Sequence, residues 1–397
     1  MEKEEKRIYA CWLACVPGIG NRTIDKLLTL CRNEKDVYCA GEKVWKEVLT
    51  ERQLVQMKDF AVREEPECLY RRIRQDGIRF IMRGDEEYPE RLERIPDPPY
   101  ALYVKGRLPV DDKPSVAVVG ARDCSEYGSF VATGIGEMLG QNDIQVISGM
   151  ARGIDGISQR AALQVGGSSY GVLGCGVDVC YPPSNRELYE DLCELGGVMS
   201  AYPPGTEARP GNFPPRNRIV SGLCDVLIVV EARAKSGTLI TVDMALEQGK
   251  DVYVVPGRIT DRLSDGCNKL VKQGAEVFLT PEDFIDELWE RWSCNPVGNE
   301  GSEALKQEDG KKRIRESNSG KSGKLLQWRP VNGVEGLSKE RKAVYEVLDF
   351  DPVTPEQIQE KLEVKYPLPK LMSMLIGLCT EGLVQQISPG YFVRRGD

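Results

Sequence analysis

Short apolar runs alternate with amphipathic stretches through the middle of the chain. Over 126–139 and 155–163 the apolar residues recur every three or four positions, which predicts helices. The runs between such stretches are shorter and largely lack polar alternation, which predicts strands that are buried on both faces. These predicted strands cover 116–119, 145–147, 170–173, 226–230 and 252–255. Buried strands that alternate with helices indicate an α/β fold with a doubly wound, mostly parallel sheet.

Two capping signals mark further helices in this region. Ser184 and Glu187 have the spacing of a capping box, and Thr280 followed by Pro281 suits a helix start. We therefore expect one helix to begin at each signal.

Residues 1–65 have a helical pattern of their own. Around Gly18 and Gly20 the pattern over 13–28 is helix, tight turn, helix. This arrangement resembles the helix-hairpin-helix motif, in which backbone N–H groups at the start of the second helix can hold a phosphate. The alternative is a plain helical hairpin that only packs.

Prolines and composition divide the rest of the chain. Prolines at 98–99 and between 109 and 114 interrupt regular structure, so we expect a connector over 66–113. The α/β core then covers 114–292. Residues 293–336 are rich in Gly, Ser, Asn, Lys and Glu, which predicts a flexible linker.

The last segment, 337–397, has the element order of a winged-helix domain. Two helices capped by Ser338 and Thr354, and a third over 370–381, precede a β-hairpin. The third helix carries only Lys370 as a candidate base reader. A protein contact or a weak DNA contact is therefore favoured over sequence-specific reading of a groove.

Length and composition agree with this division. The chain has 397 residues, which suggests about two to three domains. It has no apolar run of about 18 residues, and its first residues are too acidic for a leader, so we expect no membrane segment and no signal peptide.

The 13 cysteines include no Cys-x-x-Cys pair. We interpret them as reduced thiols of a cytoplasmic protein, and expect no disulfide framework and no metal site.

The absence of histidine narrows the possible chemistry. Without histidine, Ser-His and Cys-His nucleophiles and histidine-ligated zinc are excluded. The formal net charge of −8 argues against a protein coated in positive charge, although a local basic groove can still bind nucleic acid. The glycine clusters at 120–122, 134–136 and 171–176 lack the G-x-G-x-x-G spacing, so we expect no dinucleotide cofactor.

Cationic side chains follow the predicted strands. Arg122 comes after the first strand, with Ser125 just beyond it, and Arg152 follows the second strand. A loop rich in proline and glycine is expected over 209–218. It presents Arg209, Phe213, Arg216 and Arg218.

Two further candidates lie beyond the strand at 226–230. Lys235 and Ser236 precede a helix whose N-terminus favours anions. Loops at the carboxyl ends of parallel strands meet at one edge of the sheet, so we expect all these residues to gather there. Arginines, an aromatic ring and a helix N-terminus suit single-stranded nucleic acid, whose bases stack on the ring while guanidiniums pair with phosphates. A surface ion pair is the alternative for each arginine, and core packing is the alternative for Phe213.

Five ordered motifs carry a resemblance to a known family. They lie at 119–122 (VGAR), 148–155 (SGMARGID), 212–223 (NFPPRNRIVSGL), 236–241 (SGTLIT) and 254–257 (VVPG). Together they resemble the DprA/Smf family of DNA-processing proteins of natural transformation. The resemblance implies an extended Rossmann-like core that forms a homodimer and uses no cofactor. It also implies that the protein binds and protects single-stranded DNA and hands it to the recombinase RecA.

The resemblance assigns roles residue by residue. Arg122 matches the family's DNA-contacting arginine, Arg216, Asn217 and Arg218 match its Arg-Asn-Arg signature, and Phe213 lies in the same DNA-facing loop.

Three positions depart from the family pattern. Gln159 stands where histidine is common, which indicates a structural site, Ala201 replaces an acid, and Cys224 replaces serine.

Two other functions compete with DNA binding. The sequence is also distantly similar to nucleotide phosphoribohydrolases of the LOG type, with Lys235-Ser236-Gly237-Thr238 before a helix and Glu231 or Asp243 as the acid. Each carboxylate also has an ordinary structural interpretation. The third hypothesis is a scaffolding protein whose winged helix binds partners and whose core has no affinity for DNA.

Overall fold

The structure is a computed structural model that describes residues 3–294, 337–388 and 390–394. The linker predicted over 293–336 lies outside the described residues except for its first two positions. By its internal contacts the chain separates into two units, Met1–Asp123 with Ile135–Glu300 and Cys124–Gly134 with Gly301–Asp397, and each is described by itself. None of the described helices combines the length and apolar character needed to cross a bilayer.

Nine strands form one sheet in the larger unit. In chain order they are β1 (Arg79–Met82), β2 (Ala101–Gly106), β3 (Ser115–Val119), β4 (Gln145–Ser148), β5 (Ser169–Val172), β6 (Gly197–Ser200), β7 (Val226–Val229), β8 (Asp251–Val254) and β9 (Glu276–Val277). Their order across the sheet is β1-β2-β6-β5-β4-β3-β7-β8-β9. Neighbours from β6 to β9 are parallel, whereas β2 runs antiparallel to both β6 and β1. The predicted doubly wound, mostly parallel and Rossmann-like sheet is confirmed, and the five predicted strands correspond to β3, β4, β5, β7 and β8.

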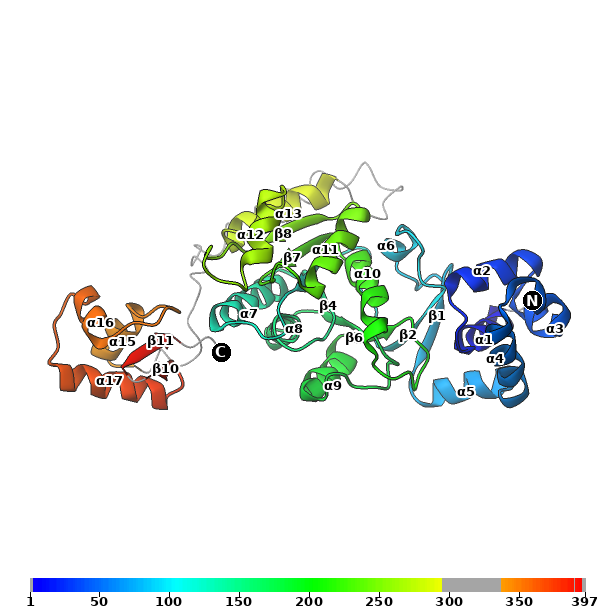
Figure 1. Cartoon of the computed structure of the whole chain (residues 1–397), viewed down its shortest axis with the longest axis horizontal. Coiled ribbons are helices and arrows are strands. Elements are labelled where there is room, and N and C mark those ends of the chain that lie inside the picture. The colour runs from blue at the N-terminus through cyan, green and yellow to red at the C-terminus, as the bar shows by residue number, and fades with distance from the viewer. Residues whose placement is uncertain (1–2, 295–336, 389, 395–397) are drawn as a thin grey trace. The chain divides into compact units, whose positions relative to one another are not determined.

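The strand order reverses beside β3. From β3 the chain moves outward to β6 through α7 (Glu126–Gln141), α8 (Ile154–Gln164) and α9 (Arg186–Leu195). It returns through α10 (Phe213–Leu223) to β7, on the other side of β3, and continues through α11 (Gly237–Glu247) and α12 (Asp265–Lys272). Because parallel crossovers are right-handed, the helices of the two halves cover opposite faces of the sheet. Figure 1 shows α10 and α11 side by side on one of them.

The expectation of an irregular connector over 66–113 is wrong. The segment forms α5 (Pro66–Gln75), β1, α6 (Glu90–Glu93) and β2, and its two strands extend the sheet. Pro66 is the first residue of α5, where a helix tolerates proline, and the other prolines lie between these elements. Strands β6 and β9 were also not predicted. Strand β9 has only two residues, and β6, with the sequence Gly-Val-Met-Ser, contains only two large apolar residues.

The N-terminal helices contain the predicted tight turn. They are α1 (Lys3–Cys15), α2 (Asn21–Leu30), α3 (Glu34–Val48), α4 (Glu51–Arg63) and α5. Gly18 lies in the turn between α1 and α2 at φ +75°, a conformation that favours glycine. Gln53 of α4 donates a hydrogen bond to the Gly18 carbonyl oxygen at 2.9 Å. The predicted order of helix, tight turn and helix is confirmed, and phosphate contact at this turn stays a prediction.

These helices share one apolar core with the antiparallel edge of the sheet. The buried side chains of Trp12, Leu27 and Trp45 belong to the same cluster as Phe80 of β1 and Tyr103 of β2. The core therefore continues across the boundary predicted after residue 65.

The two capping predictions have different outcomes. Helix α13 (Pro281–Cys294) begins as expected, because Thr280 Oγ1 accepts a hydrogen bond from the Asp283 backbone N–H at 3.2 Å. The capping box at 184–187 is not formed. Helix α9 begins at Arg186, one residue later than that box predicts. The 3₁₀ turn Pro183–Asn185 precedes it, and Asn185 makes no side-chain cap bond.

The smaller unit contains the predicted winged-helix order. It comprises α15 (Lys339–Glu346), α16 (Pro355–Lys361), α17 (Leu368–Thr380), β10 (Val384–Ser388) and β11 (Tyr391–Arg394). Ser338 and Thr354 cap the first two helices as predicted. The one candidate base reader, Lys370, forms an ion pair with Glu340 at 2.7 Å. The expectation that α17 does not read a DNA groove stays a prediction.

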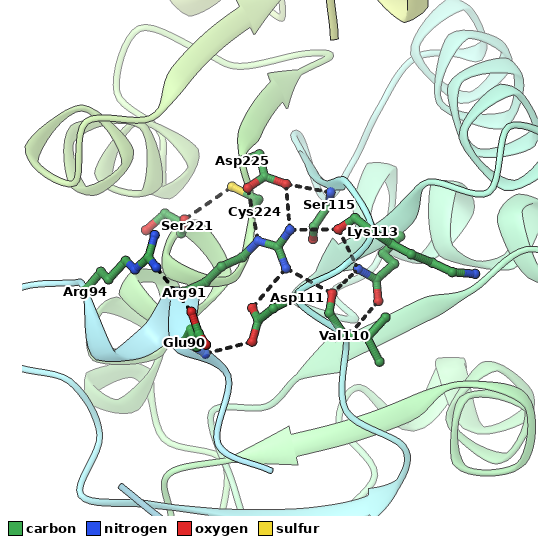
Figure 2. A network of polar contacts seen from close by, with 11 residues as sticks. Glu90, Arg91, Arg94, Val110, Asp111, Lys113, Ser115, Ser221, Cys224 and Asp225 are labelled. Carbon is green, nitrogen blue, oxygen red and sulfur yellow. Dashed lines mark hydrogen bonds and ion pairs between the residues drawn. The ribbon is translucent and has the colours of Figure 1, made fainter. Parts of the chain in front are cut away.

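A buried arginine ties the antiparallel segment to the amino edge of the parallel strands. Arg91 of α6 is 3% exposed. Its Nε and Nη2 donate to the two carboxylate oxygens of Asp225, both at 3.0 Å (Figure 2). Its remaining N–H groups donate to Asp111 Oδ1 and to the carbonyl oxygens of Val110 and Lys113. All five N–H donors of the guanidinium are therefore satisfied.

The same network fixes the starts of two central strands. Asp225, which immediately precedes β7, also accepts a hydrogen bond from the backbone N–H of Ser115, the first residue of β3, at 2.8 Å. Strands β3 and β7 flank the point where the strand order reverses. The Arg91 network thus holds the two halves of the sheet together at their amino edge.

We expect Arg91→Leu to lower the free energy of unfolding by about 3–5 kcal/mol, because it leaves the Asp225 carboxylate without its buried partner. Urea denaturation followed by circular dichroism measures the change. Arg94→Leu is the matched control, since Arg94 follows the same helix and forms only an exposed ion pair with Glu90, worth less than about 1 kcal/mol. Equal losses in the two variants would contradict a special role for Arg91.

Candidate functional site

A cavity of about 230 Å³ opens at the carboxyl ends of β3, β4 and β5. Three arginines line it, one from each of the segments 120–125, 149–153 and α10. Two aromatic rings and a cysteine also lie on its wall. The arginines are Arg122, Arg152 and Arg216, and the other three residues are Tyr181, Phe213 and Cys175.

The residues from Phe213 onward form a helix, which corrects the loop expected over 209–218. Helix α10 begins at Phe213, and its two prolines occupy the first turn. Proline is tolerated there because the first N–H groups of a helix have no partner within the helix. Residues three apart share a helix face, so Phe213 and Arg216 both reach the cavity.

Arg216 forms the floor of the cavity. It is 5% exposed. One of its terminal nitrogens, Nη1, donates to the carbonyl oxygen of Gly149 at 2.6 Å and to that of Val172, and Nε donates to Asn217 Oδ1 at 3.1 Å. The other terminal nitrogen, Nη2, has no hydrogen-bond partner among the described residues. Two donors of a buried cation are therefore available to a ligand.

A buried carboxylate lies near this cation. Asp155, in the first turn of α8, accepts a hydrogen bond from the Gly149 backbone N–H at 3.1 Å. Burial raises the pKa of Asp155, and the positive charge of Arg216 opposes that rise. Burial likewise lowers the pKa of Arg216, and Asp155 opposes that fall. Each group thus makes the burial of the other less costly.

The Phe213 ring is the centre of the cavity wall. The guanidinium carbons of Arg122 and Arg216 lie 5.5 Å and 5.8 Å from its centroid, within the range of cation–π contacts. The ring of Tyr181 lies 5.6 Å away and is inclined by 31°. Arg122 is exposed, and it forms no ion pair with any described residue. Its charge is therefore available to a ligand beside the ring.

Two glycines allow this close packing. A Cβ atom at Gly149 would lie 2.6–2.8 Å from the Arg216 guanidinium, and one at Gly174 would lie 2.8 Å from the Phe213 ring. Neither position can carry a side chain unless its neighbour moves.

Hydrogen bonds hold the loop after β4 in shape. The Asn185 amide donates to the carbonyl oxygens of Met150 and Ala151, both at 3.1 Å. The buried Gln159 accepts from the Met150 N–H at 3.1 Å and donates to the Tyr170 carbonyl oxygen at 3.0 Å. Gln159 therefore has the structural role that its replacement of histidine indicated.

The remaining predicted site residues do not line the cavity. Arg209 pairs with Glu207 at 3.1 Å, and Arg218 pairs with Asp97 at 3.1 Å on another face of α10. Asn217 supports Arg216. Within the cavity, Arg152 is paired with Asp123, although its side chain is 61% exposed.

Three predicted residues lie at helix starts. Ser236 caps α11 by accepting from the Thr238 N–H at 3.1 Å, and Lys235 is exposed beside it. Thr238 in turn donates to the Gly120 carbonyl oxygen at 3.1 Å, so this start lies at the carboxyl edge of β3 as expected. Ser125 accepts from the Gly128 N–H at 3.0 Å and caps α7.

Sequence reasoning missed Tyr181 and Cys175 in the cavity lining, and it missed the buried Asp155 near Arg216. A signal for Tyr181 exists, because it precedes two prolines as Phe213 does and follows a predicted strand. No comparable signal marks the other two. Of the acids required by the hydrolase hypothesis, Asp243 is exposed on α11 and Glu231 is buried after β7, and neither lines the cavity.

Comparisons with known proteins agree on one family. The family model of DNA recombination-mediator protein A matches residues 79–289. The DNA processing protein DprA of Streptococcus pneumoniae is 42% identical over 204 residues, which cover 51% of this chain and 72% of that protein. Its crystal structure superposes with a TM-score of 0.62 at 34% identity, covering 72% of this chain and 99% of that one. The DNA processing protein A of Helicobacter pylori, described by its single-stranded DNA binding mode, gives a TM-score of 0.50 at 29% identity and covers 54% and 96%.

We expect Gly149→Ala to lower the free energy of unfolding by about 1–3 kcal/mol, because the added methyl group displaces the Arg216 guanidinium. Thermal and urea unfolding measure the change. Gly211→Ala is the control, since a Cβ there has no neighbour within 4 Å and is expected to change stability by less than about 0.5 kcal/mol. Equal stabilities of the two variants would contradict the tight packing.

Cys175 should resist alkylation at pH 8 although it lines the cavity. Burial raises the pKa of its thiol to about 11, so little thiolate exists at that pH. We expect iodoacetamide to label the exposed Cys39 on the order of 100-fold faster, as measured by mass spectrometry of the peptides. Labelling of Cys175 should accelerate as the pH rises toward 11, and rapid labelling at pH 8 would contradict this prediction.

Proposed function

This chain belongs to the DNA recombination-mediator protein A family, and we propose that it binds single-stranded DNA in the cavity at the carboxyl ends of β3, β4 and β5. The observation that carries the proposal is the convergence of Arg122 and Arg216 on the Phe213 ring. Cations beside an aromatic ring suit a nucleotide, whose phosphate is anionic and whose base is a flat ring. The relative from Helicobacter pylori, described by its binding of single-stranded DNA, supports the same chemistry.

The donors of the cavity suit a phosphate. The Nη2 group of Arg216 and the exposed guanidinium of Arg122 offer several N–H groups that no described residue engages. Arginine pairs with phosphate through two parallel hydrogen bonds, which are stronger than neutral ones. A phosphodiester would also bring acceptor oxygens to the two Nη2 donors of Arg216 that Asp155 does not occupy.

The site lies in a recessed cavity, which favours a single strand over a duplex. The cavity holds about 230 Å³, and Arg216 at its floor is only 5% exposed. In a duplex the bases are stacked and paired inside the helix, so an aromatic wall can meet only an unpaired base. We therefore expect single strands to bind more tightly than duplexes of the same length.

The family resemblance extends the proposal beyond binding. We propose a cytoplasmic DNA-processing protein that protects incoming single strands and loads RecA onto them in natural transformation or recombination. It acts as a homodimer and without a reaction of its own. For Ser125, Arg209, Asn217, Arg218, Lys235 and Ser236, which lie outside the cavity lining, a DNA contact rests on the sequence argument alone.

We expect Arg122→Gln to weaken binding of a 50–60-nucleotide strand at least tenfold and to reduce the slope of log K against log salt by about 0.7, the contribution of one neutralised phosphate. Fluorescence anisotropy across a salt series measures both quantities. Arg71→Gln, which removes an equally exposed charge from α5, is the control and should leave both unchanged.

Unchanged affinity and slope in Arg122→Gln would reject the cavity as the DNA site. Release of ribose phosphate from nucleoside monophosphates would instead favour the hydrolase.

A further inference from the structure

We infer that Asn185 is a positioning residue, which places the cavity's arginines by tying two of its walls together. The first wall is the segment 149–152 after β4, and the second wall is the segment 181–184 before α9. Both segments contribute residues to the lining, whereas Asn185 itself does not. The inference rests on the proposed function and adds to it a residue that lies outside the five family motifs.

The side chain of Asn185 does not cap the helix that follows it. An asparagine before the first turn of a helix usually accepts a hydrogen bond from a backbone N–H of that turn, and α9 has no such bond. The Asn185 amide instead donates to the carbonyl oxygens of Met150 and Ala151 in the first wall, each at 3.1 Å. A residue whose local role is replaced by a contact distant in sequence is typical of a functional site.

These two hydrogen bonds hold an unfavourable backbone conformation in the first wall. Met150 has a φ of +52°, in the left-handed region that a residue with a side chain rarely adopts. Gln159 accepts from the Met150 N–H and Asp155 accepts from the Gly149 N–H, both at 3.1 Å. Side chains from outside the first wall therefore fix a segment that its own backbone preference would not maintain.

The first wall in turn determines where two arginines lie. The carbonyl oxygen of Gly149 accepts from Arg216 Nη1 at 2.6 Å, so it anchors the buried guanidinium at the floor of the cavity. Arg152 belongs to the first wall, and it lines the cavity. A shift of this wall would move both cations relative to Arg122, which belongs to another segment. A phosphate held by more than one arginine would then lose a contact.

Close packing fixes the path of the Asn185 amide. A Cβ at Gly156, in the first turn of α8, would lie 2.9 Å from Asn185 Nδ2 and 3.0 Å from the Ala151 carbonyl oxygen. The amide therefore reaches the first wall only because position 156 lacks a side chain. The Asn185 backbone N–H donates to the Pro182 carbonyl oxygen at 3.0 Å, so the same residue is also bound to the second wall.

The salt dependence of DNA binding distinguishes positioning from a general loss of stability. Asn185 is uncharged, so its replacement can change the slope of log K against log salt only through the arginines that it positions. We expect Asn185→Leu to reduce this slope by about 0.7, the contribution of one phosphate on a single strand. Affinity of the full-length protein for an oligothymidylate should fall about tenfold, as for the loss of one charge-assisted hydrogen bond. Fluorescence anisotropy across a salt series measures both quantities.

Asn142→Leu is the matched control. The Asn142 side chain is also partly buried, and its amide also donates to a carbonyl oxygen, that of Met138 at 2.8 Å. It follows α7 and does not line the cavity. We expect the affinity and the slope of this variant to equal those of the wild type. Thermal unfolding confirms that each variant is folded before its binding is compared.

Gly156→Ala tests the same contact without altering Asn185. The added methyl group would occupy the place of the amide, so we expect the same reduction in slope. This variant decides the outcome if Asn185→Leu does not fold.

A folded Asn185→Leu protein with the wild-type slope would overturn the inference, whether or not its affinity falls, because no phosphate contact would then depend on Asn185. If Arg122→Gln still reduced the slope, the proposed function would remain in place. A wild-type protein that binds no single strand would reject the proposed function, and the inference with it.

Discussion

A buried guanidinium is stabilised when oxygen atoms of the protein replace the water that it has lost, and this chain provides them fully at the amino edge of its parallel sheet and only in part at the carboxyl edge. At the amino edge, Arg91 donates all five of its N–H groups to two carboxylates and two carbonyl oxygens. The Asp225 carboxylate then reaches the first residue of β3. This closed network fixes the starts of β3 and β7, and through them the place where the strand order reverses. The cavity lies at the opposite ends of β3 and its neighbours β4 and β5.

At the carboxyl edge the same chemistry is left incomplete. Arg216 is buried like Arg91, but only three of its five donors have partners among the described residues. The nearby Asp155 reduces the cost of burying its charge without occupying the remaining donors. Arg91 and Arg216 thus differ in how many of their donors are satisfied within the described residues. An anion in the cavity would accept hydrogen bonds from the remaining donors of Arg216, as the carboxylates of Asp225 and Asp111 accept them from Arg91.

The sequence was most informative where its patterns are local. Apolar runs in the central strands and the caps at Ser338, Thr354 and Thr280 involve neighbouring residues, and the structure contains them as predicted. The prolines led to two wrong predictions, because a proline can mark the start or end of an element as well as interrupt one. They hid the two antiparallel strands, and they made the first turn of α10 resemble a loop.

The candidate site could be predicted only in part, because partners distant in sequence decide which cations remain available. Arg122, Arg216 and Phe213 do converge, as the strand-end argument expected. The sequence alone could not reveal that Asp97 engages Arg218 or that Asp123 engages Arg152. It also could not reveal Tyr181, whose place in the cavity depends on packing against the Phe213 ring.

The apolar cluster that joins α1–α5 to β1 and β2 has a consequence for how this architecture can change over evolution. A helical module with its own core can be gained, lost or exchanged between proteins by recombination of gene segments. Here such an exchange would expose Phe80 and Tyr103 on the edge of the sheet. It would leave an exposed apolar surface on both products. Removal of the N-terminal helices is therefore expected to destabilise this edge of the sheet, whereas the winged-helix segment has an apolar core of its own.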